Sequence, residues 1–578
     1  MSQQIKDHNI ESLMVAGRWP GADRATLITL ATVLAATGAD DDGLSYFEAL
    51  AASQPDQALP QALAGFFQVR AGDDVPAGLA RLDDAASRDL GPAQYYRGLA
   101  LAALPAEAGH AAQAVADLEF VLAVRDQFPS MMIRAAYHGL AAAYAATGKD
   151  GLAAKAAAAT GLASAPAEAR LQFGDGWANA ADGYHFGSPR LAEVAPGARV
   201  AQGYDFGDFA FVSTDRGVVA IDAGTSAQRV RTAMGDAGLH PDDISHVILT
   251  HAHFDHAGGI SALTGAGTQV IAQAGFPAEL RRQHANVLPF RYFTGAGAGF
   301  GAGEAEVTPA EIAVDQLVAD TTSVCIGGTE FVLYPTTGGE TSDALMVYLP
   351  ATGVLFAGDV MMPYLGAPFF AEGSPEGVLG TLALIAGLQP RLLVHGHTPL
   401  NQLFTVDAVP GLLAALTELR ERSLAAIGGG MTLPSMLKAG ILPEVLREHA
   451  AAVGPFLAIR DHFLQRLHHQ HTGYWQPDGQ GLEPVEAADR AAALDLLAGG
   501  RPEQFAVAAR ALLARREPAV ALEIITAGLA GHPGASELVQ LRERALCRLM
   551  ERHQLLDPFR FLIYAELAGA EIGPVATA

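Results

Sequence analysis

The pattern of hydrophobic and polar positions divides the chain into three parts. Residues 1–180 are rich in alanine and carry apolar side chains at helical spacing. Residues 181–405 contain short, continuous apolar runs of the kind that form buried strands. Helical spacing returns in residues 406–578, which are typical of helical hairpins. The sequence therefore predicts an α/β domain flanked by an N-terminal and a C-terminal α-helical domain, with these boundaries.

A faint internal repeat marks the N-terminal helical part. Gly65, Gly98 and Gly139 are spaced 33 and then 41 residues apart, and each lies close to an aromatic residue. A small residue beside an aromatic one at such a period resembles tetratricopeptide repeats, whose paired helices pack at these positions. The repeats could bind a protein or peptide. An alanine-rich array has few exposed aromatic anchors, however, which favours a packing or oligomerisation role.

Composition narrows the class of protein. Half of the 578 residues are apolar and 17% are charged, so the chain can bury several cores and is not of the disordered class. A net charge of −25 repels phosphate backbones, so we expect no nucleic-acid partner. The two cysteines exclude a disulfide framework and are expected to be reduced, packed thiols. Neither a signal peptide nor a membrane span is visible, so we expect a cytoplasmic protein.

The largest cluster of potential metal ligands follows a predicted buried strand. That strand leads into the motif H-x-H-x-D-H at residues 251–256, which places four potential metal ligands within six residues. Neutral imidazoles combined with a carboxylate suit zinc. Alternation along the backbone lets His251 and His253 point at one ion. Asp255 and His256 come round the following turn and can serve a second ion.

This motif resembles that of the metallo-β-lactamase superfamily, and three further segments match the family in order. They are the strand ending in Asp-x-Gly at residues 218–224, Leu355–Asp359, and Leu392–His397. The resemblance covers about residues 185–405 and implies an αββα sandwich that binds two metal ions. It implies that Asp359 bridges the metals and that Asp255, His256 and His397 hold the second one. His395 remains an alternative to His397, because alternation puts both on one face.

One departure from the family pattern concerns the first metal. The family has Gly-His-Thr where this chain has Gly339-Glu340-Thr341, so Glu340 stands in the place of a histidine. We predict that His251, His253 and Glu340 hold the first metal, although Glu340 could instead be a solvated loop residue. A carboxylate here makes the site more anionic and raises the pKa of metal-bound water. Glutamate at this position resembles the zinc-dependent alkylsulfatases.

The C-terminal third extends the likeness to alkylsulfatases. Gly473–Gly479, Leu482–Pro484 and Leu497–Gly500 follow the order of their dimerisation domain, over about residues 410–570. The resemblance implies a homodimer formed through the C-terminal helical domain. It does not extend to the sulfate-binding stretch of that branch, because residues 361–373 contain neither histidine nor arginine.

The predicted activity is metal-dependent hydrolysis of an organic ester-type substrate, with a hydroxide bridging two zinc ions as the nucleophile. Zinc is expected ahead of manganese or iron. An alkyl sulfate is the first candidate substrate, and a carboxylic ester, lactone or amide is the alternative. A di-iron redox protein and a non-catalytic repeat scaffold are further alternatives. Asp255 and Asp359 are the predicted catalytic residues.

The apolar segment at residues 364–370 indicates a largely hydrophobic substrate. The arginines among the candidates for substrate contact could equally lie on a solvated face. The candidates are Arg281, Arg282, Arg291, Tyr292, Tyr364 and His395.

Overall fold

The protein is described by a computed structural model. The residues whose structure is described are 24–36, 40–88, 91–125, 128, 130–159, 172–173, 176–177, 185–285, 311–362, 373–473, 479, 482–515, 517–553 and 558–569.

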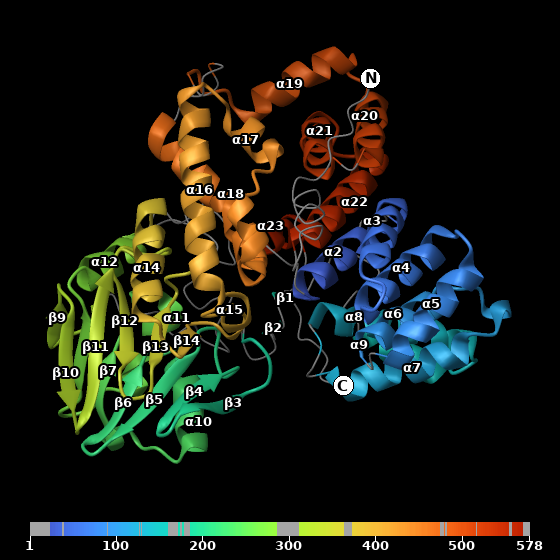
Figure 1. Ribbon diagram of the computed structural model, residues 1–578. Coiled ribbons are helices and arrows are strands. Elements are labelled where there is room, and N and C mark those ends of the chain that lie inside the picture. The colour runs from blue at the N-terminus through green and yellow to red at the C-terminus, as the bar shows by residue number, and fades with distance from the viewer. Residues whose placement is uncertain are drawn as a thin grey trace. The chain divides into compact units, whose positions relative to one another are not determined.

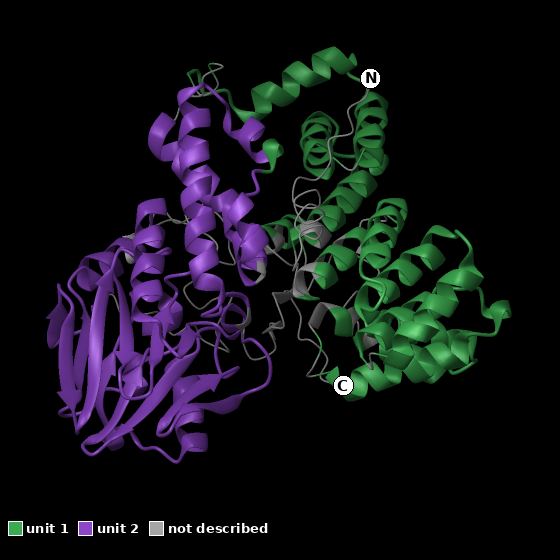
Figure 2. Cartoon of the chain, in the orientation of Figure 1, with its two compact units in different colours: residues 1–175, 438–440, 475–578 green, residues 176–437, 441–474 purple. Residues whose placement is uncertain are grey.

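The chain divides into two compact units, which Figure 2 shows in different colours. One unit comprises residues 1–175, 438–440 and 475–578, and the other comprises residues 176–437 and 441–474. The helices Ala408–Gly428 and Val453–Thr472 therefore belong to the same unit as the α/β part, whereas the helices after residue 475 belong to the other unit. The boundaries of the three predicted domains stay a prediction.

Two sheets form the centre of the second unit (Figure 1). The first has seven strands in sequence order, with parallel pairing from β6 to β9. The second has five strands, and β13 and β14 are parallel. The strands of the first sheet are β3 (Arg190–Ala195), β4 (Ala198–Gln202), β5 (Phe209–Thr214), β6 (Gly217–Ile221), β7 (Ile244–Ile248), β8 (Gln269–Gln273) and β9 (Gln316–Val318). Those of the second are β10 (Thr322–Ile326), β11 (Thr329–Thr336), β12 (Ala344–Leu349), β13 (Val354–Gly358) and β14 (Leu392–His395).

The side-chain period of two along each strand divides the core into two layers. In β6, Val219 and Ile221 join the core formed by residues of both sheets. Val218 and Ala220 face the other way and pack in the core that includes residues of α10 (Ala227–Ala237) and α12 (Phe276–Ala285). Burial on both faces explains why these strands are continuous apolar runs. The predicted α/β sandwich with flanking helices is confirmed.

A second group of helices continues the chain beyond the sheets. Helix α14 (Pro375–Leu388) packs against α16 (Ala408–Gly428), which in turn packs against α18 (Val453–Thr472) (Figure 1). The short helices α11 (Phe254–Ala257) and α15 (Thr398–Leu403) each follow a strand end, and α17 (Leu433–Ala439) lies between α16 and α18 in sequence.

The N-terminal residues form helices that pack against their neighbours in sequence. Gly98 and Gly139 both lie against Leu118, where an added Cβ would come within 3.0 Å of that side chain. These close approaches explain the glycines of the repeat, but the likeness to tetratricopeptide repeats stays a prediction. The helices are α2 (Arg24–Ala36), α3 (Asp40–Ser53), α4 (Ala58–Ala71), α5 (Val75–Arg88), α6 (Pro92–Ala102), α7 (Ala111–Ala123), α8 (Ser130–Ala146) and α9 (Asp150–Ala159).

The C-terminal residues form a further set of helices around Phe505, Ile525 and Leu538. Most of the predicted dimerisation segment Gly473–Gly479 lies outside the described residues. Among the described helices, none has the length and apolar character needed to cross a bilayer. The helices are α19 (Ala487–Ala498), α20 (Pro502–Ala514), α21 (Pro518–Gly531), α22 (Ser536–His553) and α23 (Pro558–Leu567).

The expectation of two packed thiols was wrong for one of them. Cys325 is exposed, because alternation along β10 turns its side chain away from the core that Val324 and Ile326 contact. Cys547 lies on α22 and is partly buried, and neither of these two cysteines forms a disulfide.

Candidate metal centre

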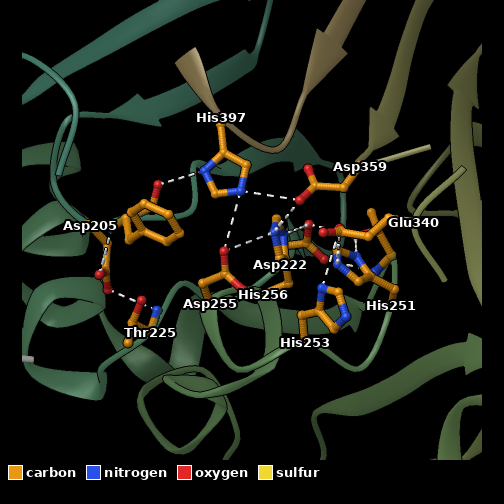
Figure 3. Close-up of polar contacts among 12 residues, drawn as sticks. Asp205, Asp222, Thr225, His251, His253, Asp255, His256, Glu340, Asp359 and His397 are labelled. Atoms are coloured by element: carbon orange, nitrogen blue, oxygen red, sulfur yellow. Dashed lines mark hydrogen bonds and ion pairs between the residues drawn. The ribbon is translucent and has the colours of Figure 1, made fainter. Parts of the chain in front are cut away.

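The candidate metal centre lies where strands of both sheets end (Figure 3). His251 and His253 follow β7, and Asp255 and His256 lie on α11 immediately after them. Asp359 directly follows β13, His397 follows β14, and Glu340 lies in the loop between β11 and β12. Parallel strands bring their carboxyl ends to one edge, so residues distant in sequence meet there.

Seven buried side chains form two groups at this edge. His251, His253 and Glu340 form the first, with 3.2 Å between His253 Nδ1 and Glu340 Oε2. The second consists of Asp255, His256, Asp359 and His397. Within each group the potential ligand atoms all lie within 4.8 Å of one another. The structure thus brings together all seven predicted ligands, with Asp359, which was predicted to be shared, in the second group. Their binding of metal stays a prediction.

The unsatisfied atoms of these side chains fit a metal site. His251 Nε2 and Asp359 Oδ1 are buried and make no hydrogen bond to any described residue. His256 Nε2 and Glu340 Oε2 lie 3.2 Å from other candidate ligands, Asp359 Oδ2 and His253 Nδ1. Burying such atoms without a partner costs about 1–3 kcal/mol for a neutral group and more for a charged one. Divalent cations would compensate that cost, and imidazole nitrogen with carboxylate oxygen is a donor set that suits zinc.

Burial and the neighbouring charges shift the pKa values of the ligands. Burial lowers the pKa of His251 well below its usual value, and the nearby His256 and His253 lower it further. Burial alone would also lower the pKa of His256, but Asp359 and Asp255 raise it well above its usual value. Burial raises the pKa of Glu340 to about 7. The metal-free centre therefore holds protons that bound metal would displace.

Asp222 orients one histidine of each group. Its Oδ1 accepts a hydrogen bond from the Thr250 amide (2.7 Å), and its Oδ2 accepts one from the Thr250 hydroxyl (2.7 Å). Asp222 Oδ2 also lies 2.9 Å from His256 Nδ1, and the Thr250 hydroxyl lies 3.0 Å from His251 Nδ1. Asp222 adopts a positive φ of 63°, an uncommon conformation that this network holds in place. The sequence marked Asp222 only through the Asp-x-Gly likeness, not through this role.

A loop that sequence reasoning missed supports His397. The Phe206 carbonyl lies 2.8 Å from His397 Nδ1, and the two rings have centroids 4.8 Å apart. Asp205 fastens this loop by accepting hydrogen bonds from the amides of Thr225 (2.9 Å) and Ser226 (3.1 Å). No hydrophobic period or ligand motif marks the segment in the sequence.

The structure distinguishes the two histidines at the end of β14. His397 belongs to the second ligand group, whereas His395 belongs to neither. The His395 ring is 1% exposed, and its Nε2 lies 2.9 Å from the Phe404 carbonyl. Burial lowers its pKa to about 4. These are the contacts of a packed side chain, and the predicted contact of His395 with substrate stays a prediction.

The other predicted substrate contacts are only partly described. Arg281 is exposed on α12, and Arg282 forms an ion pair with Glu279 of the same helix. Glu279 Oε2 also accepts a hydrogen bond from the Ser342 hydroxyl at 3.2 Å, which ties α12 to the loop of Glu340. Arg291, Tyr292 and Tyr364 lie outside the described residues.

Comparison with known proteins agrees with this geometry. Residues 203–397 match the metallo-beta-lactamase superfamily. A hydroxyacylglutathione hydrolase of Rhodobacter capsulatus is 29% identical over 171 residues, which are 29% of this chain and 54% of that protein. A linear primary-alkylsulfatase of a Pseudomonas species is 22% identical over 334 residues, 52% of this chain and 62% of that protein. The chain thus spans little more than half the length of these relatives.

A solved structure has a similar fold over a larger part of the chain. The stereoselective inverting sec-alkylsulfatase Pisa1 from Pseudomonas sp. superposes with a TM-score of 0.52 at 19% identity. The match covers 66% of this chain and 65% of that protein. It extends beyond the matched superfamily domain into the flanking helices, as the likeness to alkylsulfatases predicts.

Proposed function

We propose that this chain, whose residues 203–397 form a metallo-beta-lactamase domain, is a dinuclear zinc hydrolase of an organic ester-type substrate. The observation that carries the proposal is the pair of adjoining, buried ligand groups. Its relatives include proteins named as a hydrolase and as an alkylsulfatase, which supports hydrolysis of an ester-type bond.

In this proposal the two groups hold one ion each. His251, His253 and Glu340 hold the first, and Asp255, His256 and His397 hold the second. Asp359 would be the shared ligand, because its Oδ2 lies 3.2 Å from His256 Nε2 and its charge also acts on His251 and Glu340 of the first group. Bound zinc would polarise the oxygen of the scissile group and lower the pKa of water into the neutral range.

The residues of the chain prepare this centre for that chemistry. Burial alone would raise the pKa of Asp255, but His256 and His397 hold it below its usual range. Both histidines likewise hold the pKa of Asp359 low against the effect of burial. The two proposed catalytic carboxylates are therefore ionised at neutral pH. Asp222 and the Phe206 carbonyl fix the ring orientation of their histidines, which is how outer hydrogen bonds tune a metal site.

An alkyl sulfate is the first candidate substrate, because the alkylsulfatase match covers 52% of the chain. A carboxylic ester, lactone or amide is the second, and two observations favour it. The charge of Arg282 is already paired with Glu279, and Arg281 is exposed, so neither reproduces a buried cationic pocket for sulfate. We also propose a homodimer formed through the C-terminal helices, as the alkylsulfatase likeness implies.

Metal analysis and a substrate panel test the proposal together. Elemental analysis of folded protein should find close to two zinc ions per chain. The zinc-loaded protein is then assayed against alkyl sulfates, aryl esters, lactones and lactams. Turnover of at least one class, abolished by a chelator and restored by zinc, is the expected result. Protein that holds only iron would favour the redox alternative, and protein that binds no metal would favour the scaffold.

A further inference from the structure

The loop that carries Glu340 is held by direct backbone contacts at the start of α14. Gly373 has a φ of 69°, and a Cβ added there would overlap the Gly339 carbonyl oxygen. The same Cβ would lie 3.1 Å from the carbonyl oxygen of Glu340. A Cβ added at Gly377 would lie 2.7 Å from the Gly338 carbonyl oxygen. The backbone before α14 therefore rests on the ligand loop with no side chain between them.

This contact is also close to the shared ligand. The Gly339 amide donates a hydrogen bond of 3.0 Å to the carbonyl of Val360, the residue after Asp359. The loop of Glu340 is thus enclosed by the segment after β13 on one side and by Gly373 on the other. Movement of Gly373 would release one of these two supports.

One side chain from α18 fastens Gly373. Arg466 Nη2 donates a hydrogen bond of 3.2 Å to the Gly373 carbonyl. Arg466 is half-buried, and α18 belongs to the same compact unit as the sandwich. Hydrogen bonds from a charged group are stronger than those between neutral groups, so this contact can hold a backbone segment in place.

We propose that Arg466 is a positioning residue for Glu340, through Gly373, and that α18 thereby sets the affinity of the first metal group for its ion. The proposal rests on the proposed function, because it takes Glu340 to be a metal ligand. Loss of an outer-shell partner typically weakens metal binding 10–100-fold. The second group should be spared, because Asp222 and Phe206 orient His256 and His397 from a different side.

Zinc titration of metal-free protein against a chromophoric chelator tests this without any assay of activity. Arg466→Gln should weaken the first of the two zinc sites 10–100-fold and leave the second within about threefold of wild type. Arg466→Lys should restore most of the loss, because an ammonium can donate to the same carbonyl. Arg422→Gln is the matched control, since Arg422 on α16 also donates to a backbone carbonyl, that of Leu442. It should leave both sites unchanged.

Two further variants separate the possible failures. If Glu340→Ala leaves both affinities unchanged, Glu340 is not a ligand and the proposed first site is wrong in that residue. Suppose instead that Glu340→Ala weakens the first site. If Arg466→Gln then leaves the first site unchanged, or weakens both sites equally, only the proposed role of Arg466 is wrong. In the Glu340→Ala background, Arg466→Gln should have no additional effect on zinc binding. Should Arg466→Gln fail to fold, Gly373→Ala tests the same contact and should also weaken the first site.

Discussion

At the scale of single residues, Glu340 is the side chain that sets this centre apart from the usual three-histidine site. Glu340→Ala should lose about one metal ion per chain and most activity, because two imidazoles alone hold the first ion weakly. Glu340→His should retain both ions, since imidazole is also a zinc ligand. Elemental analysis of the two variants beside wild type measures this. Full metal content in the alanine variant would contradict the assignment.

Asp343 provides a residue-scale prediction that concerns stability. It is fully buried, and burial raises its pKa to about 7. An unfolded aspartate has a pKa of about 3.9, so the native state binds more protons between these values. The stability that this group contributes is complete below pH 4 and is lost as the pH rises through 7.

Asp343→Asn removes this titration while keeping the shape of the side chain. The variant should therefore gain stability relative to wild type as the pH rises from 4.5 to 8, by no more than about 4 kcal/mol. Melting temperatures of the metal-free proteins at the two pH values measure the gain, and each kcal/mol corresponds to about 2–4 °C for a domain of this size. A difference between variant and wild type that stays constant with pH would refute the predicted pKa.

At the scale of elements, close helix contacts explain the glycines of the N-terminal part. A Cβ at Gly98 of α6 would lie 2.8 Å from the Leu118 side chain of α7. Gly98→Val should destabilise this helical part by about 1–3 kcal/mol through overpacking. Calorimetric unfolding should show the loss, whereas zinc content should stay at the wild-type level because the ligands belong to the other compact unit. Unchanged unfolding would show that the helices can separate without cost.

The strands show how far the apolar pattern reaches at this scale. Runs such as Val218–Ile221 and Leu392–Val394 predicted strands, and the structure has strands there. The short segment from Gly203 to Asp208 has no strand or helix period of apolar residues. It contacts His397 through a backbone carbonyl, that of Phe206. This segment supports the metal centre through main-chain atoms, and every residue has these atoms, so the sequence does not reveal the contact.

At the scale of the whole molecule, α19 offers a surface for the proposed homodimer. Leu496 and Leu497 are 83% and 84% exposed, and large apolar side chains this exposed mark interaction surfaces when they lie together. Light scattering of wild type should give twice the mass of one chain. Leu497→Glu should shift the protein toward the monomer, because it places a charge in an apolar interface. Val520→Glu on α21, at a less exposed apolar position, is the control. A wild-type monomer at micromolar concentration would contradict the prediction.

The sequence by itself determined the fold class and the cluster of candidate metal ligands. Strand period and helix period follow from local geometry, and four ligands lie within six residues, so neither requires knowledge of distant contacts. The order of the remaining segments, read through a family likeness, was enough to nominate Glu340, Asp359 and His397. The structure brings these three to the same edge as His251 and Asp255.

Only the tertiary structure decided which groups hold those ligands in place. His395 and His397 share a strand end and a residue type, and their roles separate only because one ring meets the Phe404 carbonyl and the other meets Asp359. Asp222, Phe206 and Arg466 act through hydrogen bonds to partners tens of residues away or more. The packing of the folded chain determines which of these residues meet. No fixed spacing in the sequence corresponds to such contacts, so the sequence alone does not predict them.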